Sequence, residues 1–251
     1  MRYNVNELDQ ADLTRQMAQL ITEIYDVFSK YSIDEIKGVC TGCCVSKKSI
    51  EEILTVPLRE LSWYAVYEYL DAAKYDVEFL ISETKYLIPK IIELYISSEY
   101  VRQPSEFTFQ TCHFDKTEYW CKEEIDLIKE FAELHFKKAI IEKDTHFQSN
   151  ELIFMWYEAG LNIDFLFDIW IQAVDYPKAL YDYAGMLQFS FKDLNYESGW
   201  TSYALDKQFT DWALSDDIFN TFSKKILLAI EDIDSVDDHQ LDAYEYVLQL
   251  I

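Results

Sequence analysis

The scarcity of turn-forming residues limits what this chain can fold into more than any other feature does. Only five Gly and four Pro occur among its 251 residues. Sandwiches and barrels need many tight turns, and tight turns depend on Gly, Pro and Asn. Hydrophobic residues nevertheless make up 50% of the sequence, which excludes an acidic disordered tail and leaves enough apolar surface for a core. The combination favours long helices joined by short connections.

The spacing of apolar residues predicts the same class. In residues 8–31 they recur every three or four positions, as in Leu13, Met17 and Leu20, which is typical of an amphipathic helix. Similar spacing predicts helices over 62–74, 77–96, 122–143, 150–159, 163–173, 177–187, 206–214, 216–231 and 236–250. We therefore expect an all-α fold of about ten helices packed as helical hairpins, in a HEAT-like or irregular array. The expected organisation is a single α-helical domain, 1–251, with a subdivision into 1–120 and 121–251 as the alternative.

Several helix boundaries carry recognisable signals. Ser46 and Ser49 are candidate helix caps, and Ser49 with Glu52 matches a capping box. Gly160 is expected to break a helical hairpin, and Asn162 to cap the helix that follows.

Two other segments depart from simple helical periodicity. Pro89 lies inside the pattern of 77–96, so a kink or break is expected near Lys85. From Phe107 to His113 apolar and polar residues alternate, which predicts a short strand or an extended loop.

The chain is strongly acidic, with a formal net charge of −24, and the acid is concentrated towards the C-terminus. Residues 151–251 hold 19 acidic and five basic residues, together with four of the six Trp. Such a field repels nucleic acid and anionic membranes and attracts basic partners. No apolar run is long enough for a membrane span, and no export signal is visible, so we expect a cytoplasmic protein with reduced thiols.

Cys40, Cys43 and Cys44 form a C-x-x-C-C sequence. C-x-x-C is the usual half of a zinc site, but the other half would have to come from Cys112 and Cys121, whose spacing no common zinc knuckle uses. A redox C-x-x-C normally opens a helix beside a strand, and no such pattern surrounds this one. We therefore expect small turn residues with free thiols and no bound cofactor. A zinc site made of Cys40, Cys43, Cys112 and Cys121 is the first alternative, and a redox pair is the second.

No catalytic motif is present. The sequence lacks the nucleophile elbow, the P-loop, the dinucleotide-binding glycines and a zinc-protease H-E-x-x-H. The aspartates of 232–242 lack the Gly of a calcium-binding loop. We therefore expect no enzyme. With 46 acidic residues, a hydrolase or lyase with an unrecognised carboxylate site stays open as an alternative.

The segment from Tyr181 to Trp212 interleaves aromatic residues with acids. Tyr and Trp are common anchors of protein interfaces, and surrounding carboxylates suit a basic partner. The candidate partner-binding residues are Tyr181, Tyr183, Asp193, Tyr196, Glu197, Trp200, Asp206, Asp211 and Trp212. Trp200 and Trp212 are the expected anchors. The alternative is that the aromatics belong to the core and the acids only face solvent.

Two phrases downstream of the Cys turn carry a family resemblance. They are Leu54-Thr-Val-Pro-Leu-Arg-Glu-Leu61 and Leu87-Ile-Pro-Lys-Ile-Ile-Glu-Leu94. The stretch from Cys40 to Tyr95, about a fifth of the chain, resembles a group of uncharacterised bacterial helical proteins. The resemblance implies a bacterial, α-helical protein and implies no activity or site residue.

Charge, aromatics and resemblance together suggest inhibition by binding. A nuclease needs a basic groove for phosphate, and an acidic inhibitor is steered rapidly to such a groove. We expect an immunity-type protein that neutralises a basic bacterial toxin, such as a nuclease, through an acidic aromatic face, and that binds neither nucleic acid nor membranes. The alternatives are a zinc-stabilised helical adaptor or scaffold protein and the hydrolase or lyase named above.

Overall fold

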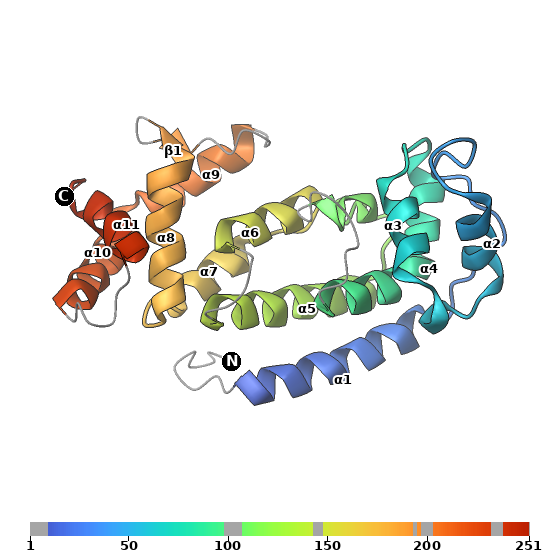
Figure 1. Ribbon diagram of the computed structural model, residues 1–251, viewed down its shortest axis with the longest axis horizontal. Helices are drawn as coiled ribbons and strands as arrows, with labels where there is room; N and C mark the ends of the chain where they lie inside the picture. The colour runs from blue at the N-terminus through green and yellow to red at the C-terminus, as the bar shows by residue number, and fades with distance from the viewer. Residues whose placement is uncertain are drawn as a thin grey trace. The chain divides into compact units, whose positions relative to one another are not determined.

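A computed structural model of the chain describes residues 10–97, 107–142, 148–192, 195–196, 203–231 and 238–250. The fold is an all-α helical array, as the sequence predicts, with eleven α-helices in this part of the chain (Figure 1). A two-residue antiparallel pair of strands, β1 (Phe191–Lys192) and β2 (Asn195–Tyr196), is the whole of the described sheet structure. Among the described residues, no helix is long and apolar enough to cross a membrane.

The helices follow one another with short connections. In chain order they are α1 (Gln10–Phe28), α2 (Lys47–Thr55), α3 (Trp63–Asp71), α4 (Val77–Ile96), α5 (Lys122–Ile141), α6 (Ser149–Glu158), α7 (Asp164–Gln172), α8 (Pro177–Ser190), α9 (Tyr203–Ala213), α10 (Asp216–Glu231) and α11 (Asp238–Leu248). Two 3-10 turns, η2 (Leu58–Glu60) and η4 (Gln110–Cys112), lie between them.

The chain divides into two compact units. Unit 1 comprises Met1–Leu13, Glu133–Phe154 and Ile163–Ile251, and unit 2 comprises Thr14–Ala132 and Met155–Asn162. The sequence-based expectation of one domain, or of a division after residue 120, stays a prediction.

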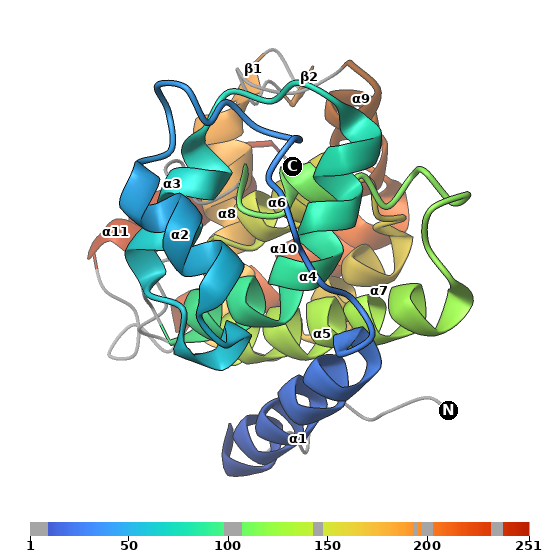
Figure 2. The ribbon, with the colours of Figure 1, turned by 90° about the vertical axis from the view of Figure 1, so that its right-hand side faces the viewer.

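Unit 2 packs α3 against both α2 and α4, as Figure 2 shows. Its core contains a cluster of aromatic rings. Phe109 stacks on Trp156 with ring centroids 4.7 Å apart, and Phe131 meets both rings edge-on. Aromatic pairs of this kind add to the stabilisation that burial of their apolar surface provides.

A buried carboxylate in unit 2 organises the chain around it. The side chain of Glu124 has no exposed surface and forms ion pairs with Lys85 and Lys30, each at 2.9 Å. The Tyr31 hydroxyl and the Cys121 backbone N–H also donate to it. Burial opposes ionisation of this carboxyl, but the hydrogen bonds from Tyr31, Lys30 and Lys85 outweigh it and lower its pKa to about 2.

Unit 1 packs α8 against α10 and α11. Tyr183 on α8 stacks on Phe222 of α10 with ring centroids 3.9 Å apart, and the Trp170 indole N–H donates to the Ala179 carbonyl at 3.1 Å. Asp182, also buried, accepts from the Ser149 hydroxyl at 2.6 Å and pairs with Lys178 at 2.9 Å.

Several predicted boundaries are confirmed. Ser46 caps α2 by accepting from the Ser49 backbone N–H at 3.2 Å. Gly160 ends α6 with a φ of 85°, and the N–H groups of residues 160 and 161 bond back to the carbonyls of Tyr157 and Trp156, which is a Schellman ending. A Cβ at Gly160 would also lie 2.6 Å from the backbone N of Asp115, so only glycine fits there.

Two predicted caps are wrong. Ser49 does not start a capping box, because it lies inside α2, and Glu52 accepts instead from the backbone N–H of Ser62. The N-cap of α7 is Ile163, which makes no side-chain cap hydrogen bond, and not Asn162.

The predicted break near Lys85 and the predicted extended segment at 107–113 also differ from the structure. Helix α4 continues through Lys85 and past Pro89 to Ile96. Residues 107–113 form turns around η4, because this conformation buries Phe109 and Cys112 completely and no described strand lies beside them.

We expect Glu124→Gln to lower the free energy of unfolding by about 3–5 kcal/mol, because it leaves the buried ammonium group of Lys85 without its counter-charge. The stabilisation from the ionised Glu124 is present above the unfolded pKa of 4.5 and is lost as the pH falls towards about 2. The wild type should therefore lose more stability between pH 5 and pH 2 than the variant does. Urea unfolding at several pH values measures both effects.

Glu123→Gln is the matched control, because Glu123 is the exposed neighbour on the same helix turn. Its unfolding free energy should stay within about 0.5 kcal/mol of the wild type. Equal effects of the two substitutions would contradict the assigned role of Glu124.

Candidate functional site

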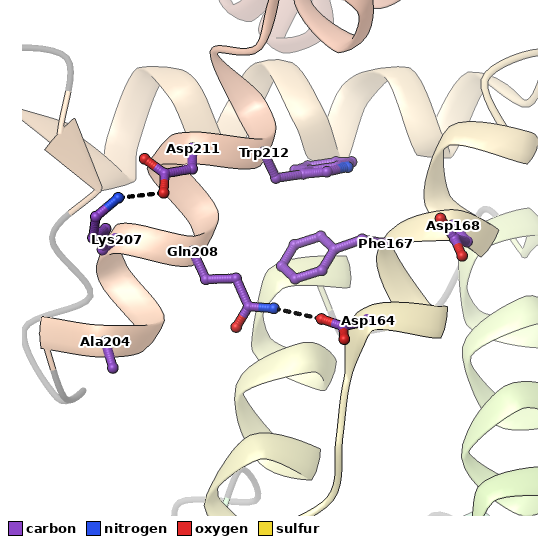
Figure 3. A pocket seen from close by; sticks show the side chains of 8 residues that line it. All are labelled: Asp164, Phe167, Asp168, Ala204, Lys207, Gln208, Asp211 and Trp212. Carbon is purple, nitrogen blue, oxygen red and sulfur yellow. Dashed lines mark hydrogen bonds and ion pairs between the residues drawn. The ribbon is translucent and has the colours of Figure 1, made fainter.

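An acidic cleft lies between α7 and α9 in unit 1 and encloses about 530 Å³ (Figure 3). Its lining combines carboxylates with two aromatic rings. The lining residues are Asp164, Phe167, Asp168, Ala204, Lys207, Gln208, Asp211 and Trp212.

Helical spacing explains how the polar residues reach the cleft. Asp164 and Asp168 are four residues apart on α7 and share a face, as do Lys207 and Asp211 on α9. Lys207 forms an ion pair with Asp211, and the Gln208 amide donates to Asp164 at 2.9 Å. The lining thus carries three carboxylates against one ammonium group. Asp168 is exposed and makes no ion pair with any residue that the structure describes.

The apolar part of the lining belongs to a larger aromatic cluster. The rings of Phe167 and Trp212 lie 4.9 Å apart and point towards each other in Figure 3, and Trp212 is 5.1 Å from Trp170. Trp212 is half-buried, so part of the indole reaches the cleft. Carboxylates around an aromatic surface suit a lysine or arginine side chain. Such a side chain forms charge-assisted hydrogen bonds with the carboxylates and cation–π contacts with the aromatic rings.

Two of the residues expected from the sequence line this cleft, namely Asp211 and Trp212. Asp206 and Tyr181 are half-buried and do not line it. Tyr183 is completely buried, and its hydroxyl donates to the Ala213 carbonyl at 2.7 Å, so it belongs to the core of unit 1.

The side chains of the other four candidate partner-binding residues are not described by the structure. Asp193, Glu197 and Trp200 lie outside the described residues, and Tyr196 is described only by its place in β2.

Sequence reasoning missed the other six residues of the cleft. Ala204, Lys207 and Gln208 lie within the segment that the sequence singled out but were not among its candidates, and Asp164, Phe167 and Asp168 lie on α7, before that segment. Two aspartates at i and i+4 beside an aromatic residue were the available signal. On an amphipathic helix this pattern equally describes a solvated face, which is why it did not stand out.

A second candidate group is the cysteine turn of unit 2, defined as Cys40, Cys43 and Cys44. The sulfur of Cys43 lies 3.4 Å from that of Cys40 and 3.6 Å from that of Cys44, and all three sulfurs lie within 4.8 Å of one another. Cys112 is completely buried and Cys121 is exposed, and neither belongs to this group. The structure therefore brings Cys44 to the C-x-x-C pair, where the sequence offered Cys112 and Cys121.

Unit 2 holds the start of the cysteine turn firmly. The Cys40 backbone N–H donates to the Ala73 carbonyl at 2.8 Å, and the Gly38 N–H donates at 2.8 Å to buried Glu83. A Cβ at Gly38 would lie 2.6 Å from the Leu80 Cα, so the chain passes α4 at a distance that only glycine allows.

The thiols of the turn differ in acidity. Hydrogen bonds from the Tyr75 hydroxyl, and then from Cys43, lower the pKa of Cys40 to about 6. Hydrogen bonding to Cys40 and Cys44 raises the pKa of Cys43 to about 11. The thiolate is the form of cysteine that binds metal ions.

An aromatic group on α3 lies at the surface. Helical spacing places Trp63, Val66, Tyr67 and Leu70 on one face of this helix. Val66 and Leu70 are buried, but Trp63 is 43% exposed and packs edge-on against Tyr64 and Tyr67.

No protein-family model matches the chain, and neither a curated protein nor a solved structure is significantly similar to it. The candidate sites therefore depend on their own geometry and chemistry.

We expect Trp212→Ala to lower the free energy of unfolding by about 3 kcal/mol, because Trp212 contacts four rings of unit 1 and its loss leaves a cavity. Asp168→Ala should change it by less than about 0.5 kcal/mol, because its side chain is exposed. Denaturant unfolding followed by circular dichroism measures both. A change below about 1 kcal/mol for Trp212→Ala would show that the indole is not part of the core.

Proposed function

We propose that this chain is an immunity-type binding protein of the bacterial cytoplasm that neutralises a basic toxin, such as a nuclease. The acidic cleft between α7 and α9 carries the proposal. It receives lysine or arginine side chains of the toxin between Asp164, Asp168 and Asp211, against the rings of Phe167 and Trp212.

The composition of the cleft supports a cationic ligand. Each of its carboxylates sits within one helical turn of an aromatic or amide group, so a guanidinium ion can make hydrogen bonds and stack at the same place. Asp164 and Asp168 are both exposed carboxylates of α7; Asp164 already accepts from Gln208, and Lys207 is paired with Asp211, which leaves Asp168 for an incoming cation. A basic side chain that enters here replaces water around Asp168.

The charge of the surrounding segment supports rapid association. Residues 151–251 carry a net charge of −14, and this field extends beyond the cleft by about a Debye length. A toxin that binds nucleic acid needs a basic groove for phosphate. An acidic inhibitor meets that groove quickly, which is the requirement for protecting a cell that produces its own toxin.

Two alternative functions stay predictions, namely a zinc-stabilised helical adaptor and a hydrolase or lyase. The sulfur geometry of the cysteine turn favours a metal site, with or without an adaptor function. The hydrolase or lyase alternative stays an untested prediction, and turnover that one Asp or Glu substitution abolishes would support it.

The proposal is tested by capturing the partner from a lysate of the native host and measuring its binding to purified variants. Asp168→Lys should lower the association rate constant about tenfold at low salt, because it reverses one charge of the cleft, while the dissociation rate constant changes less. The wild-type association rate constant should also fall steeply as salt rises.

Asp71→Lys is the matched control, because Asp71 is an exposed acid at the end of α3 in unit 2 and its reversal changes the net charge equally. It should change the association rate constant less than twofold. Equal effects of the two reversals would show that the association rate depends on the overall charge of the protein and not on the acidic cleft. A basic partner whose toxic activity continues in the saturated complex would contradict neutralisation.

A further inference from the structure

Three sulfur atoms converge at the cysteine turn, and no part of the proposed function uses them. The distances of 3.4 and 3.6 Å between neighbouring sulfurs place Cys43 in contact with both Cys40 and Cys44. Cys40 is buried, Cys44 is half-buried and Cys43 is exposed, so the group has an inner wall and an open side.

The spacing of the sulfurs matches the first coordination shell of one metal ion. With metal–sulfur bonds of about 2.3 Å, two thiolates lie about 3.8 Å apart in a tetrahedral site and about 4.0 Å apart in a trigonal one. The two neighbouring sulfur pairs reach this spacing when they separate by a few tenths of an ångström, and the third pair, within 4.8 Å, needs to close by about 1 Å at most.

The identity of the ligands selects the ion. Among the described residues, no His, Asp or Glu joins the group of Cys40, Cys43 and Cys44. Sulfur ligands alone favour soft ions, and three of them suit Cu(I), whereas structural zinc takes four protein ligands.

The surroundings of the turn support ligand binding by a preformed site. The Cys40 backbone N–H donates to the Ala73 carbonyl at 2.8 Å, which fixes the residue that carries the buried sulfur. The turn ends at Ser46, the cap of α2, where the positive end of the helix dipole favours thiolate charge.

We propose that Cys40, Cys43 and Cys44 form a binding site for one Cu(I) ion, with three thiolate ligands and an entry path on the exposed side of Cys43. This assignment replaces the expectation of free thiols. A disulfide between Cys40 and Cys43 would need an oxidant and would leave Cys44 unused, whereas one ion uses all three sulfurs.

The test titrates the reduced, full-length protein with Cu(I) under anaerobic conditions against a chromophoric Cu(I) chelator. We expect one equivalent to bind, with metal–thiolate absorption in the near ultraviolet. Cys43→Ser and Cys44→Ser should each weaken binding about 100-fold or more, since loss of even an outer-shell partner costs up to that factor. Cys121→Ser is the matched control, because Cys121 is exposed and outside the group, and it should bind as the wild type does.

A second measurement needs no variant and stays informative if a substitution disturbs folding. Bound Cu(I) should protect Cys43 and Cys44 from alkylation, while Cys121 reacts equally with and without the ion. No binding at one equivalent, unchanged affinity in both Ser variants, or equal loss in Cys121→Ser would overturn the proposal. One equivalent of Zn(II) held by the same cysteines, with Cu(I) excluded, would overturn the assigned ion, and a Cys40–Cys43 disulfide in protein isolated anaerobically would overturn the site.

Discussion

The buried carboxylate of Glu124 is the interaction on which unit 2 depends. A carboxylate without exposed surface costs several kcal/mol to desolvate, and it persists only because Lys85, Lys30 and Tyr31 all reach it. Lys85 is itself buried and also donates to the Tyr119 carbonyl, so one ammonium group joins α4, the start of α5 and the loop before it. Such a network constrains register more than it adds stability, because a shifted helix would leave a buried charge alone.

The remaining acids follow a different rule, since 46 acidic residues cannot all find partners among 22 basic ones. Most ion pairs within a described helix are spaced by four residues, as in Lys122 with Asp126 and Lys207 with Asp211, and exposed pairs of this kind add little stability. The surplus acidity of residues 151–251 therefore adds little to stability, and its self-repulsion works against compactness. In the proposed function this surplus attracts a basic partner. In unit 1 the acids that surround an aromatic surface lie at the α7–α9 cleft, which makes this cleft the place where charge and binding chemistry coincide.

Local signals predicted the fold well, because the features that end and cap helices act over a few residues. Periodicity placed α4 and α5 within two residues of their observed ends, and Ser46 and Gly160 acted as their residue types suggest. The errors arose where tertiary packing decides. Alternation at 107–113 resembles a strand, but Phe109 turns inward to stack on Trp156, a residue 47 positions away in sequence. Tyr183 looked like an interface anchor by composition, and only packing against Phe222 of α10 shows that it is core.

The cysteine turn shows why motif spacing alone does not predict which sulfur atoms lie together. Motif spacing asks for two half-sites, because most zinc sites combine pairs from distant segments, and by that criterion Cys112 and Cys121 were the natural complement. The spacing of cysteines in the sequence does not show whether two adjacent cysteines direct their sulfur atoms to the same side of the chain. Cys44 follows Cys43 directly, and side chains of adjacent residues point apart in helices and strands. Only the irregular turn between Gly38 and the α2 cap brings both sulfurs to one side, and that turn exists because Glu83 and Ala73 hold the preceding backbone. The chemistry of the turn thus depends on contacts with residues more than 28 positions downstream, which no local motif contains.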